Sequence, residues 1–209
     1  MDYLTELFCH IDDFCKAFEP QYKKYLIQHG KKRNRNACIS LSEIMTVYVL
    51  FHLLRFGQFK YFYLFYIKLF CRDALPKMPS YSRFVELYPA AIAPMAALLE
   101  ASLSPCEGLS FVDSTPLRVC HNRRIYRHKT FAARGKTSMG WFFGFKLHLA
   151  INHKGELLDL RLTSDNTDDR KGLEKLARSL FGLVFADKGY LGKALQKKLT
   201  EEEDIRLIT

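Results

Sequence analysis

The chain has 209 residues, of which 48% are hydrophobic, and its formal net charge at pH 7 is +10. This length suits one large domain or two small ones, and the hydrophobic share excludes a disordered chain. Because a strongly positive chain attracts polyanions, nucleic acid is the expected partner, with an anionic membrane surface as the alternative.

The N-terminal end and the cysteines indicate a cytoplasmic protein. Asp2 and Glu6 lie where a signal peptide would carry basic and then apolar residues, so no signal peptide is expected. The six cysteines include no Cys-x-x-Cys pair, which argues against a zinc knuckle and favours reduced thiols. The most apolar region, residues 44–71, is interrupted by charged side chains, and we therefore expect buried helices there and no membrane span.

Residues 1–105 are predicted to form a helical domain. Ser40 and Glu43 match a capping box, so a helix should begin after Ser40 and end before Gly57. An aromatic-rich helix is expected at about residues 60–71, and Ser80 should cap a third helix that ends before a proline. The basic run at residues 31–35 is either a solvated loop or an arm that contacts phosphates. We expect this domain to bind DNA or to serve an accessory role.

Residues 106–209 follow a different pattern, in which the hydrophobic period becomes two. Strands are expected from Leu109, at residues 145–151 and at 158–162, followed by a helix, a short apolar strand at 183–186, a second helix and a last strand at 205–208. We expect the helix before residue 183 to be capped near Thr167 or Asp168. Three antiparallel strands followed by right-handed crossovers predict a mixed sheet, of the α/β or α+β class, with spatial order 3-2-1-4-5.

Two aspartates stand at the ends of the strands that this order makes neighbours. Asp113 follows the apolar start of the first strand, and Asp187 ends the fourth. Two carboxylates at close range repel each other unless a cation lies between them, and oxygen ligands of this kind suit Mg²⁺ or Mn²⁺. The sequence therefore predicts a metal site for phosphodiester chemistry. Taken singly, each aspartate also fits a turn or a helix cap.

A basic stretch separates the first two strands. Between Asp113 and Glu156 there is no acidic residue, whereas nine side chains are Lys or Arg. They are Arg118, Arg123, Arg124, Arg127, Lys129, Arg134, Lys136, Lys146 and Lys154. We expect a long mobile loop that follows a phosphate backbone, with a solvated loop as the alternative. Lys146 and His148 share the polar face of the second strand, where they either contact phosphate or, for His148, serve as a half-buried structural histidine.

The residues also resemble those of a known family. The segments 111–117 (FVDSTPL), 135–149 (GKTSMGWFFGFKLHL) and 186–190 (ADKGY) resemble insertion-sequence transposases of the DDE type. The resemblance implies a ribonuclease-H-like catalytic domain, Mg²⁺ dependence, and cleavage and strand transfer at terminal inverted repeats and target DNA. It further implies a homodimer on DNA, located with the nucleoid. It assigns Asp113 and Asp187 as the first two metal-binding acids and adds Lys188 to the DNA-binding residues.

The same family pattern requires a third acid, a glutamate on a helix beyond the fifth strand. The acidic run Glu201, Glu202, Glu203 and Asp204 precedes that strand and reads as a solvated helix end, so we carry the third role onto no residue. We therefore expect a C-terminally truncated catalytic domain that is inactive as it stands. The alternatives are a DNA-binding regulator that occupies element ends and a host nuclease of the same fold. An RNA-binding module is less favoured, because the strands show no pattern of stacking aromatics.

Overall fold

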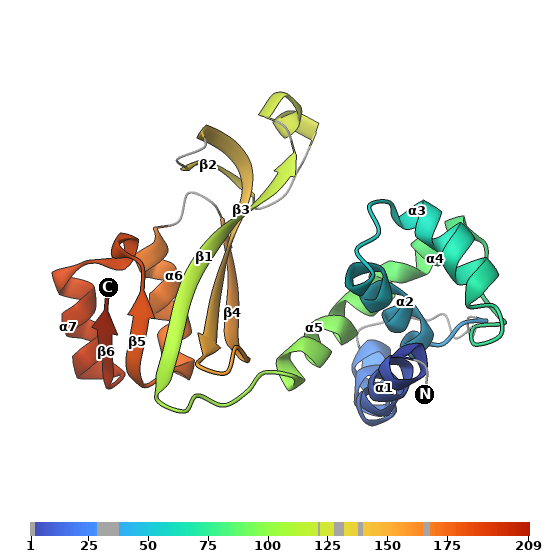
Figure 1. Cartoon of the computed structure of the whole chain (residues 1–209), viewed down its shortest axis with the longest axis horizontal. Helices are drawn as coiled ribbons and strands as arrows, with labels where there is room; N and C mark the ends of the chain where they lie inside the picture. The colour runs from blue at the N-terminus through green and yellow to red at the C-terminus, as the bar shows by residue number, and fades with distance from the viewer. Residues whose placement is uncertain (1–2, 29–37, 121, 128–131, 138–139, 165–167) are drawn as a thin grey trace. The chain divides into compact units, whose positions relative to one another are not determined.

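The computed structural model describes residues 3–28, 38–120, 122–127, 132–137, 140–164 and 168–209. The chain divides into two compact units, Met1–Ala101 and Ser102–Thr209 (Figure 1). The first unit is helical and the second contains the sheet, in agreement with the predicted fold class. The division lies a few residues before the boundary expected at residue 105. The basic run at residues 31–35 lies outside the described residues.

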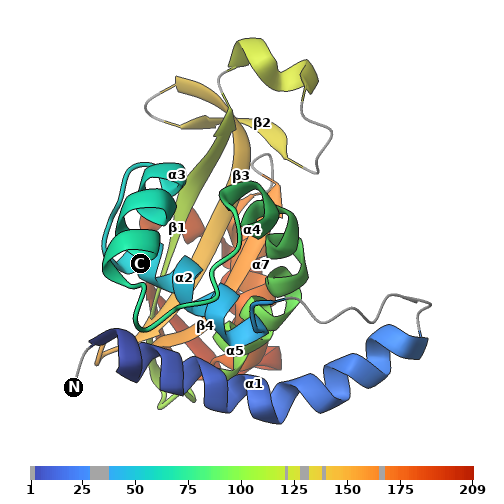
Figure 2. The same ribbon diagram turned by 90° about the vertical axis from the view of Figure 1, so that its right-hand side faces the viewer.

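The first unit is built from helices. They are α1 (Tyr3–Gln28), α2 (Leu41–Leu53), α3 (Phe59–Tyr61), the π-helix η1 (Phe62–Phe70), α4 (Tyr81–Leu87), the 3-10 helix η2 (Tyr88–Ala91) and α5 (Ile92–Ala101). Figure 2 shows α1 along its length. Two of these helices, α1 and α5, were not placed from the sequence; each contains an internal proline, Pro20 in α1 and Pro94 in α5.

The predicted caps form in the first unit. Glu43 N–H donates to Ser40 Oγ at 3.1 Å, and Ser40 N–H donates to Glu43 Oε2 at 2.6 Å, which completes the capping box of α2. Ser80 Oγ accepts from Arg83 N–H at the start of α4. The aromatic helix predicted at residues 60–71 is present as α3 and η1, and its buried residues pack with those of α2 and α4 in one core.

One helical run in this unit is apolar enough to cross a membrane. Among the described residues, Tyr81–Ala101 passes this test with a mean hydropathy of 1.3. Length and composition alone are weak evidence for a membrane span, because core helices of soluble proteins share them. The region at residues 44–71 does not pass as a span. Its prediction as buried helices holds on one side only, because Phe62, Tyr63 and Ile67 are buried whereas Leu69 and Phe70 are exposed.

The second unit contains a six-stranded mixed sheet. Its elements are β1 (Leu109–Cys120), η3 (Asn122–Arg127), β2 (Ala133–Thr137), β3 (Gly140–Asn152), β4 (Leu157–Ser164), α6 (Asp169–Leu176), η4 (Ala177–Ser179), β5 (Gly182–Ala186), η5 (Lys188–Tyr190), α7 (Lys193–Glu202) and β6 (Ile205–Ile208). Antiparallel pairing joins β4 to β3 and β3 to β1, and parallel pairing joins β1 to β5 and β5 to β6. The five predicted strands thus have the predicted neighbours.

The strand β2 was not predicted, and it adds a sixth strand to the five expected ones. It pairs with the first residues of β3, so that Lys136 lies opposite Trp141, within a stretch that was expected to be one long mobile loop. The long strands β1 and β3 twist together beyond the rest of the sheet, and β2 and η3 lie at this projecting end of the second unit (Figure 1). This projecting part is called the arm below and comprises the described residues 118–120, 122–127, 132–137 and 140–144.

The face of the sheet that the helices cover is the less apolar one. The core of the second unit joins Val112, Ala150 and Val184 of the strands to the buried leucines of α6 and α7. His148 and Asn152 are buried on this same face, whereas Phe111 on the other face is 41% exposed. The expectation that residues 183–186 are covered on both faces is therefore wrong for the described residues of this unit, because α6 and α7 both pack on one side.

Candidate active site

The structure brings Asp113 and Asp187 to neighbouring positions. In the parallel pairing of β1 with β5, Val112 lies opposite Ala186, and each aspartate is the next residue along its strand. Neighbouring strands are about 4.8 Å apart. The pairing predicted for these two strands is therefore present, and it places two carboxylates that are far apart in the sequence next to each other.

A stacked aromatic pair shows which face of the sheet the two carboxylates share. Phe111 and Phe185 stack with ring centroids 5.4 Å apart. Side chains alternate along a strand, so Asp113 and Asp187, each two residues further on, lie on the same face as these rings. Both aspartates are exposed. The pair is thus open to an ion and its waters from the face that α6 and α7 leave uncovered.

Backbone amides orient both carboxylates in the same way. Ser114 N–H donates to Asp113 Oδ1 and Lys188 N–H donates to Asp187 Oδ1, each at 2.7 Å. Each carboxylate accepts this bond through one oxygen. Hydrogen bonds to ligating carboxylates are the usual way in which a protein fixes their orientation toward a metal.

A third carboxylate, Asp169, lies on the helix-covered side of β1. The hydroxyl of Ser114 donates to Asp169 Oδ1 at 2.9 Å, and Lys146 Nζ forms an ion pair with the same oxygen at 3.0 Å. Asp169 is the first residue of α6, where the helix dipole favours a negative charge. Sequence reasoning considered Asp168 as the cap and missed Asp169; the consecutive aspartates at a helix start were the available signal.

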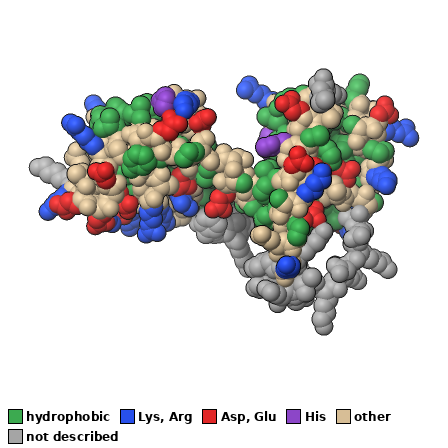
Figure 3. Space-filling model, turned by 90° about the horizontal axis from the view of Figure 1, so that it is seen from below, with side chains coloured by type: hydrophobic (Ala, Val, Ile, Leu, Met, Phe, Trp, Pro, Cys, Tyr) green, Lys and Arg blue, Asp and Glu red, His purple; other side chains and the backbone are tan. Residues whose placement is uncertain are grey.

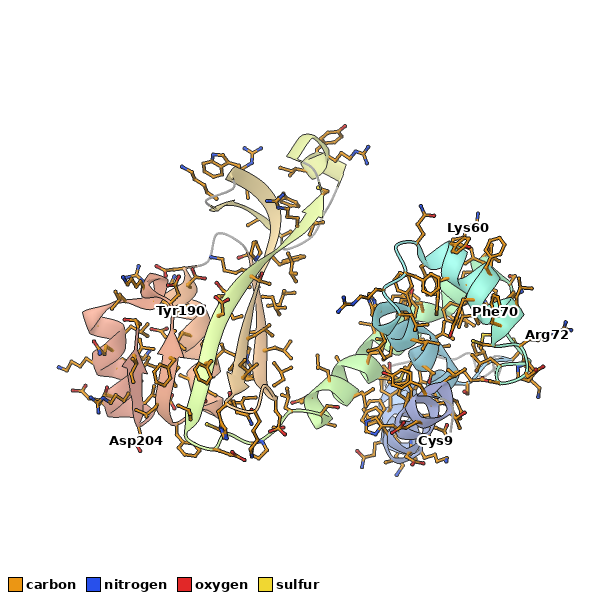
Figure 4. The ribbon with its side chains drawn as sticks, in the orientation of Figure 1. Cys9, Lys60, Phe70, Arg72, Tyr190 and Asp204 are labelled. Carbon is orange, nitrogen blue, oxygen red and sulfur yellow. The ribbon has the colours of Figure 1, made fainter. Side chains whose placement is uncertain are left out.

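Tyr190 connects the three acids electrostatically. Its side chain is 2% exposed, and its hydroxyl makes no hydrogen bond of normal geometry with the described residues. Burial raises the pKa of Tyr190 to about 12, the nearby Ser114 hydroxyl acts in the opposite direction, and Asp169, Asp113 and Asp187 raise it further. Figure 4 labels Tyr190 near the end of β5, beside β1. The phenol is therefore a protonated donor within electrostatic reach of all three carboxylates.

The donor set fits a hard divalent cation in part. Two carboxylates with open access suit Mg²⁺ or Mn²⁺, which retain several waters and bind phosphate oxygens at their remaining positions. Across the described ranges, no group of three or more His, Cys, Asp or Glu residues is close enough to hold a metal. The backbone carbonyl of Asp204, the last residue of the acidic run, accepts from Gly182 N–H at the other end of β5 from Asp187. The acidic run therefore lies away from the pair, as expected.

The comparison with known families agrees with this geometry. Residues 103–209 match the family described as "Transposase DDE domain". The chain belongs to the DDE transposase family. The match covers almost all of the second unit, including both aspartates and the strands that carry them. No curated protein matches the chain.

The transposase carries four of its predicted DNA-binding side chains at the surface. Arg124, Arg134, Lys136 and Lys188 are exposed. For Arg123 and Arg127 the structure describes only the backbone, within η3, and Lys129 lies outside the described residues. On the face of the molecule shown in Figure 3, acidic and basic side chains are interspersed. The stretch of the arm without acidic residues is therefore a more specific indication of a DNA-binding surface than the net charge of the whole chain.

One predicted DNA contact of the transposase, His148, needs correction, whereas that of Lys146 stays a prediction. Lys146 and His148 point to the opposite face of β3 from the side on which Asp113 lies, because Asp113 pairs with Leu149. His148 is fully buried, its Nε2 bonds to Thr163 Oγ1 at 3.0 Å, and burial lowers its pKa. His148 is therefore a structural histidine, but it is fully buried where a half-buried one was expected, and its Nδ1 has no hydrogen-bond partner among the described residues. Lys146 is half-buried and forms an ion pair with Asp169.

Proposed function

We propose that this transposase acts on the ends of a bacterial insertion sequence, and that Asp113 and Asp187 hold the divalent metal for DNA cleavage and strand transfer. The supporting observation is their placement on one face of neighbouring parallel strands, inside the segment that matches the family. When bound, Mg²⁺ or Mn²⁺ would supply an activated water or 3′-hydroxyl for in-line displacement at phosphorus.

The other residues of the proposed site bind and orient DNA. The exposed Lys188 directly follows Asp187, and Arg124, Arg134 and Lys136 extend the positive surface along the arm. These cations would neutralise backbone phosphates of the inverted repeats and of the target, and such contacts give affinity without sequence preference. We further propose that the protein acts as a homodimer on DNA and that it is located with the nucleoid in the cytoplasm.

Full strand transfer requires one more carboxylate than the described residues bring to the pair. We therefore expect the 209-residue chain to bind element ends but to be inactive in strand transfer, with any residual cleavage depending on Asp113 and Asp187. The same observation favours a second function, a regulator that occupies the ends without cutting them. The two functions differ in their need for the acids, because a regulator binds DNA equally well without Asp113 and Asp187.

The test measures metal binding and DNA binding separately. Wild-type protein, Asp113→Asn, Asp187→Asn and the control Asp204→Asn are titrated with Mn²⁺ by calorimetry, and with labelled fragments that flank the gene. Asp204 is exposed and has φ 51°, a conformation that asparagine tolerates, so its variant should fold. We expect the two site variants to lose Mn²⁺ binding and cleavage but to retain DNA binding.

Three results separate the hypotheses. Unchanged Mn²⁺ affinity in Asp113→Asn and Asp187→Asn would exclude these residues as the metal site. Retained DNA binding, with Mn²⁺ binding but no cleavage by the wild-type chain, would favour the regulator. Metal-dependent cleavage of fragments that lack inverted repeats would favour a nuclease.

A further inference from the structure

The arm carries aromatic residues that the proposed metal site does not use. Trp141 is the only tryptophan of the chain and is 60% exposed near the start of β3. Tyr126, in η3, is 75% exposed. Large rings are usually buried in cores or interfaces, because they remove much apolar area from water. A tryptophan displayed on a projecting hairpin is therefore well placed to contact a ligand.

Cations lie beside this tryptophan. Lys136 is its direct partner across the β2–β3 pair, and Lys136 Nζ lies 5.8 Å from the centroid of the indole ring. Arg134 is two residues before Lys136 and therefore on the same face of the hairpin. The sequence between Asp113 and Glu156 has no acidic residue. The β2–β3 hairpin thus exposes a flat aromatic ring with positive side chains beside it, and residues 114–155 contribute no carboxylate to this surface.

This chemistry fits a nucleotide better than the other anionic partners. A phosphate can lie on Lys136 or Arg134 while the attached base stacks on the indole, and stacking of this kind tolerates any base. An acidic peptide would use the charges but has no general need for the exposed ring face. An anionic membrane interface also accommodates tryptophan, so vesicles are a necessary comparison in the test below. In an intact duplex the base faces are covered by their neighbours, so a stacking site requires an unpaired or unstacked base.

We propose that Trp141 is a stacking platform for an unpaired nucleobase of the DNA substrate, with Lys136 and Arg134 on the adjacent phosphates. This inference rests on the proposed function and deepens it, since it names the form of DNA that the arm recognises. Cleavage and strand transfer produce DNA ends, where bases are easier to unpair than inside a duplex. The arm would hold such an end separately from the metal.

Because Trp141 is the only tryptophan, its fluorescence reports on this site alone in the full chain. The probes are a single-stranded dT oligonucleotide and a blunt duplex of equal length, with binding followed independently by anisotropy of a labelled copy. We expect dT to quench the emission of Trp141 at saturation. Trp141→Ala should weaken binding of dT by about 10-fold, and binding of the blunt duplex by a smaller factor, because only its end pairs can supply an unstacked base. Phe70→Ala, an exposed aromatic of the first unit, is the matched control.

The outcomes are distinct from those of the metal-site test. Unchanged emission at saturating dT, or an equal loss of single-strand and duplex affinity in Trp141→Ala, would overturn the proposal. Quenching by anionic vesicles but not by dT would point to a membrane instead and would also overturn it. Quenching that persists in Asp113→Asn would support the stacking site even if the metal site proved wrong.

Discussion

The hydroxyl of Ser114 donates a hydrogen bond to Asp169 Oδ1 over 2.9 Å, and so joins the strand that carries Asp113 to the first turn of α6. The backbone amide of Ser114 donates to Asp113 at the same time. One residue therefore couples the exposed carboxylate of the proposed metal site to a half-buried carboxylate held by Lys146. This coupling makes the orientation of Asp113 depend on α6.

Asp169→Asn should weaken Mn²⁺ binding by about 10-fold, because residues that orient metal ligands affect affinity on this scale. The amide removes the charge that balances Lys146, and the position of Ser114 becomes less defined. Calorimetric titration of the folded variant measures the effect. The neighbouring Asp168→Asn is the control, since Asp168 pairs with Arg170 and asparagine can still cap α6. Equal Mn²⁺ affinities in the two variants would show that Asp169 has no orienting role.

Tyr190→Phe should stabilise the fold slightly while it weakens the site. The hydroxyl is buried without a normal hydrogen bond, so its removal should raise the free energy of unfolding by about 1 kcal/mol. If the phenol donates to a carboxylate when the metal is bound, Mn²⁺ affinity should fall in the same variant. Thermal unfolding without metal and calorimetry with Mn²⁺ measure the two effects. A variant that is less stable and binds Mn²⁺ normally would contradict both expectations.

Gly172→Ala should destabilise the second unit even though alanine favours helices. A Cβ at Gly172 of α6 would lie well inside van der Waals contact of the His148 ring. Overpacking of this kind costs about 1–3 kcal/mol, more than the gain of about 1 kcal/mol in helix propensity. Urea unfolding measures the cost, and Gly189→Ala, where no atom is within 4 Å, is the control. A smaller cost of Gly172→Ala in a His148→Ala background would identify the ring as the cause.

The stability of the second unit should fall below about pH 6.5. Burial lowers the pKa of His148 from its ordinary value of 6.5, and Lys146 and Lys175 act in the same direction, against Asp169. In the unfolded chain His148 binds a proton below pH 6.5, whereas in the folded chain it does so only at lower pH. Acid therefore favours the unfolded state, and this stability is present above pH 6.5 and lost as the pH falls.

Urea unfolding between pH 7.5 and 5.5 tests this expectation. The contribution of one histidine to the slope is at most about 1.4 kcal/mol per pH unit. His148→Gln should reduce the slope over this range. An identical slope in wild type and His148→Gln would mean that His148 is protonated equally in both states. The depressed pKa of Asp168, about 2, affects stability only at much lower pH.

Much of the fold was predictable because it depends on local signals. The capping box of Ser40 and Glu43 forms as expected, since the bonds involve residues three apart. The strands of the sheet follow from period-two alternation, and their order follows from the handedness of crossovers. This order is sufficient to place Asp113 and Asp187 on neighbouring strands, as the pairing of β1 with β5 shows.

The prediction from the sequence was wrong about which face of the sheet the helices cover. The apolar residues of β3 suggested a buried face opposite Lys146 and His148, yet α6 packs on the side of His148. Alternation shows that the two faces of a strand differ, but it does not say which one another element covers. The close approach is possible because Gly172 leaves room for the imidazole, a fit between residues that are distant in sequence.

The network around Asp113 and the display of Trp141 were also outside the reach of the sequence. Asp169 and Tyr190 belong to other elements than Asp113, and only the packing of α6 and η5 against β1 brings them near it. Trp141 lies in a stretch predicted as a loop, and its exposure follows from the pairing of β2 with β3.

The amino-acid sequence by itself determined the helical first half, the strand order of the second half, the family resemblance and the pair of aspartates, because caps, hydrophobic periods and crossover handedness act over short or regular separations. The tertiary structure alone decided that the Ser114 hydroxyl donates to Asp169, that Tyr190 is buried with no hydrogen bond of normal geometry to the described residues, and that His148 lies in the core. The physical reason is that burial and side-chain contacts depend on which surfaces pack together, and packing joins residues whose separation along the chain follows no period.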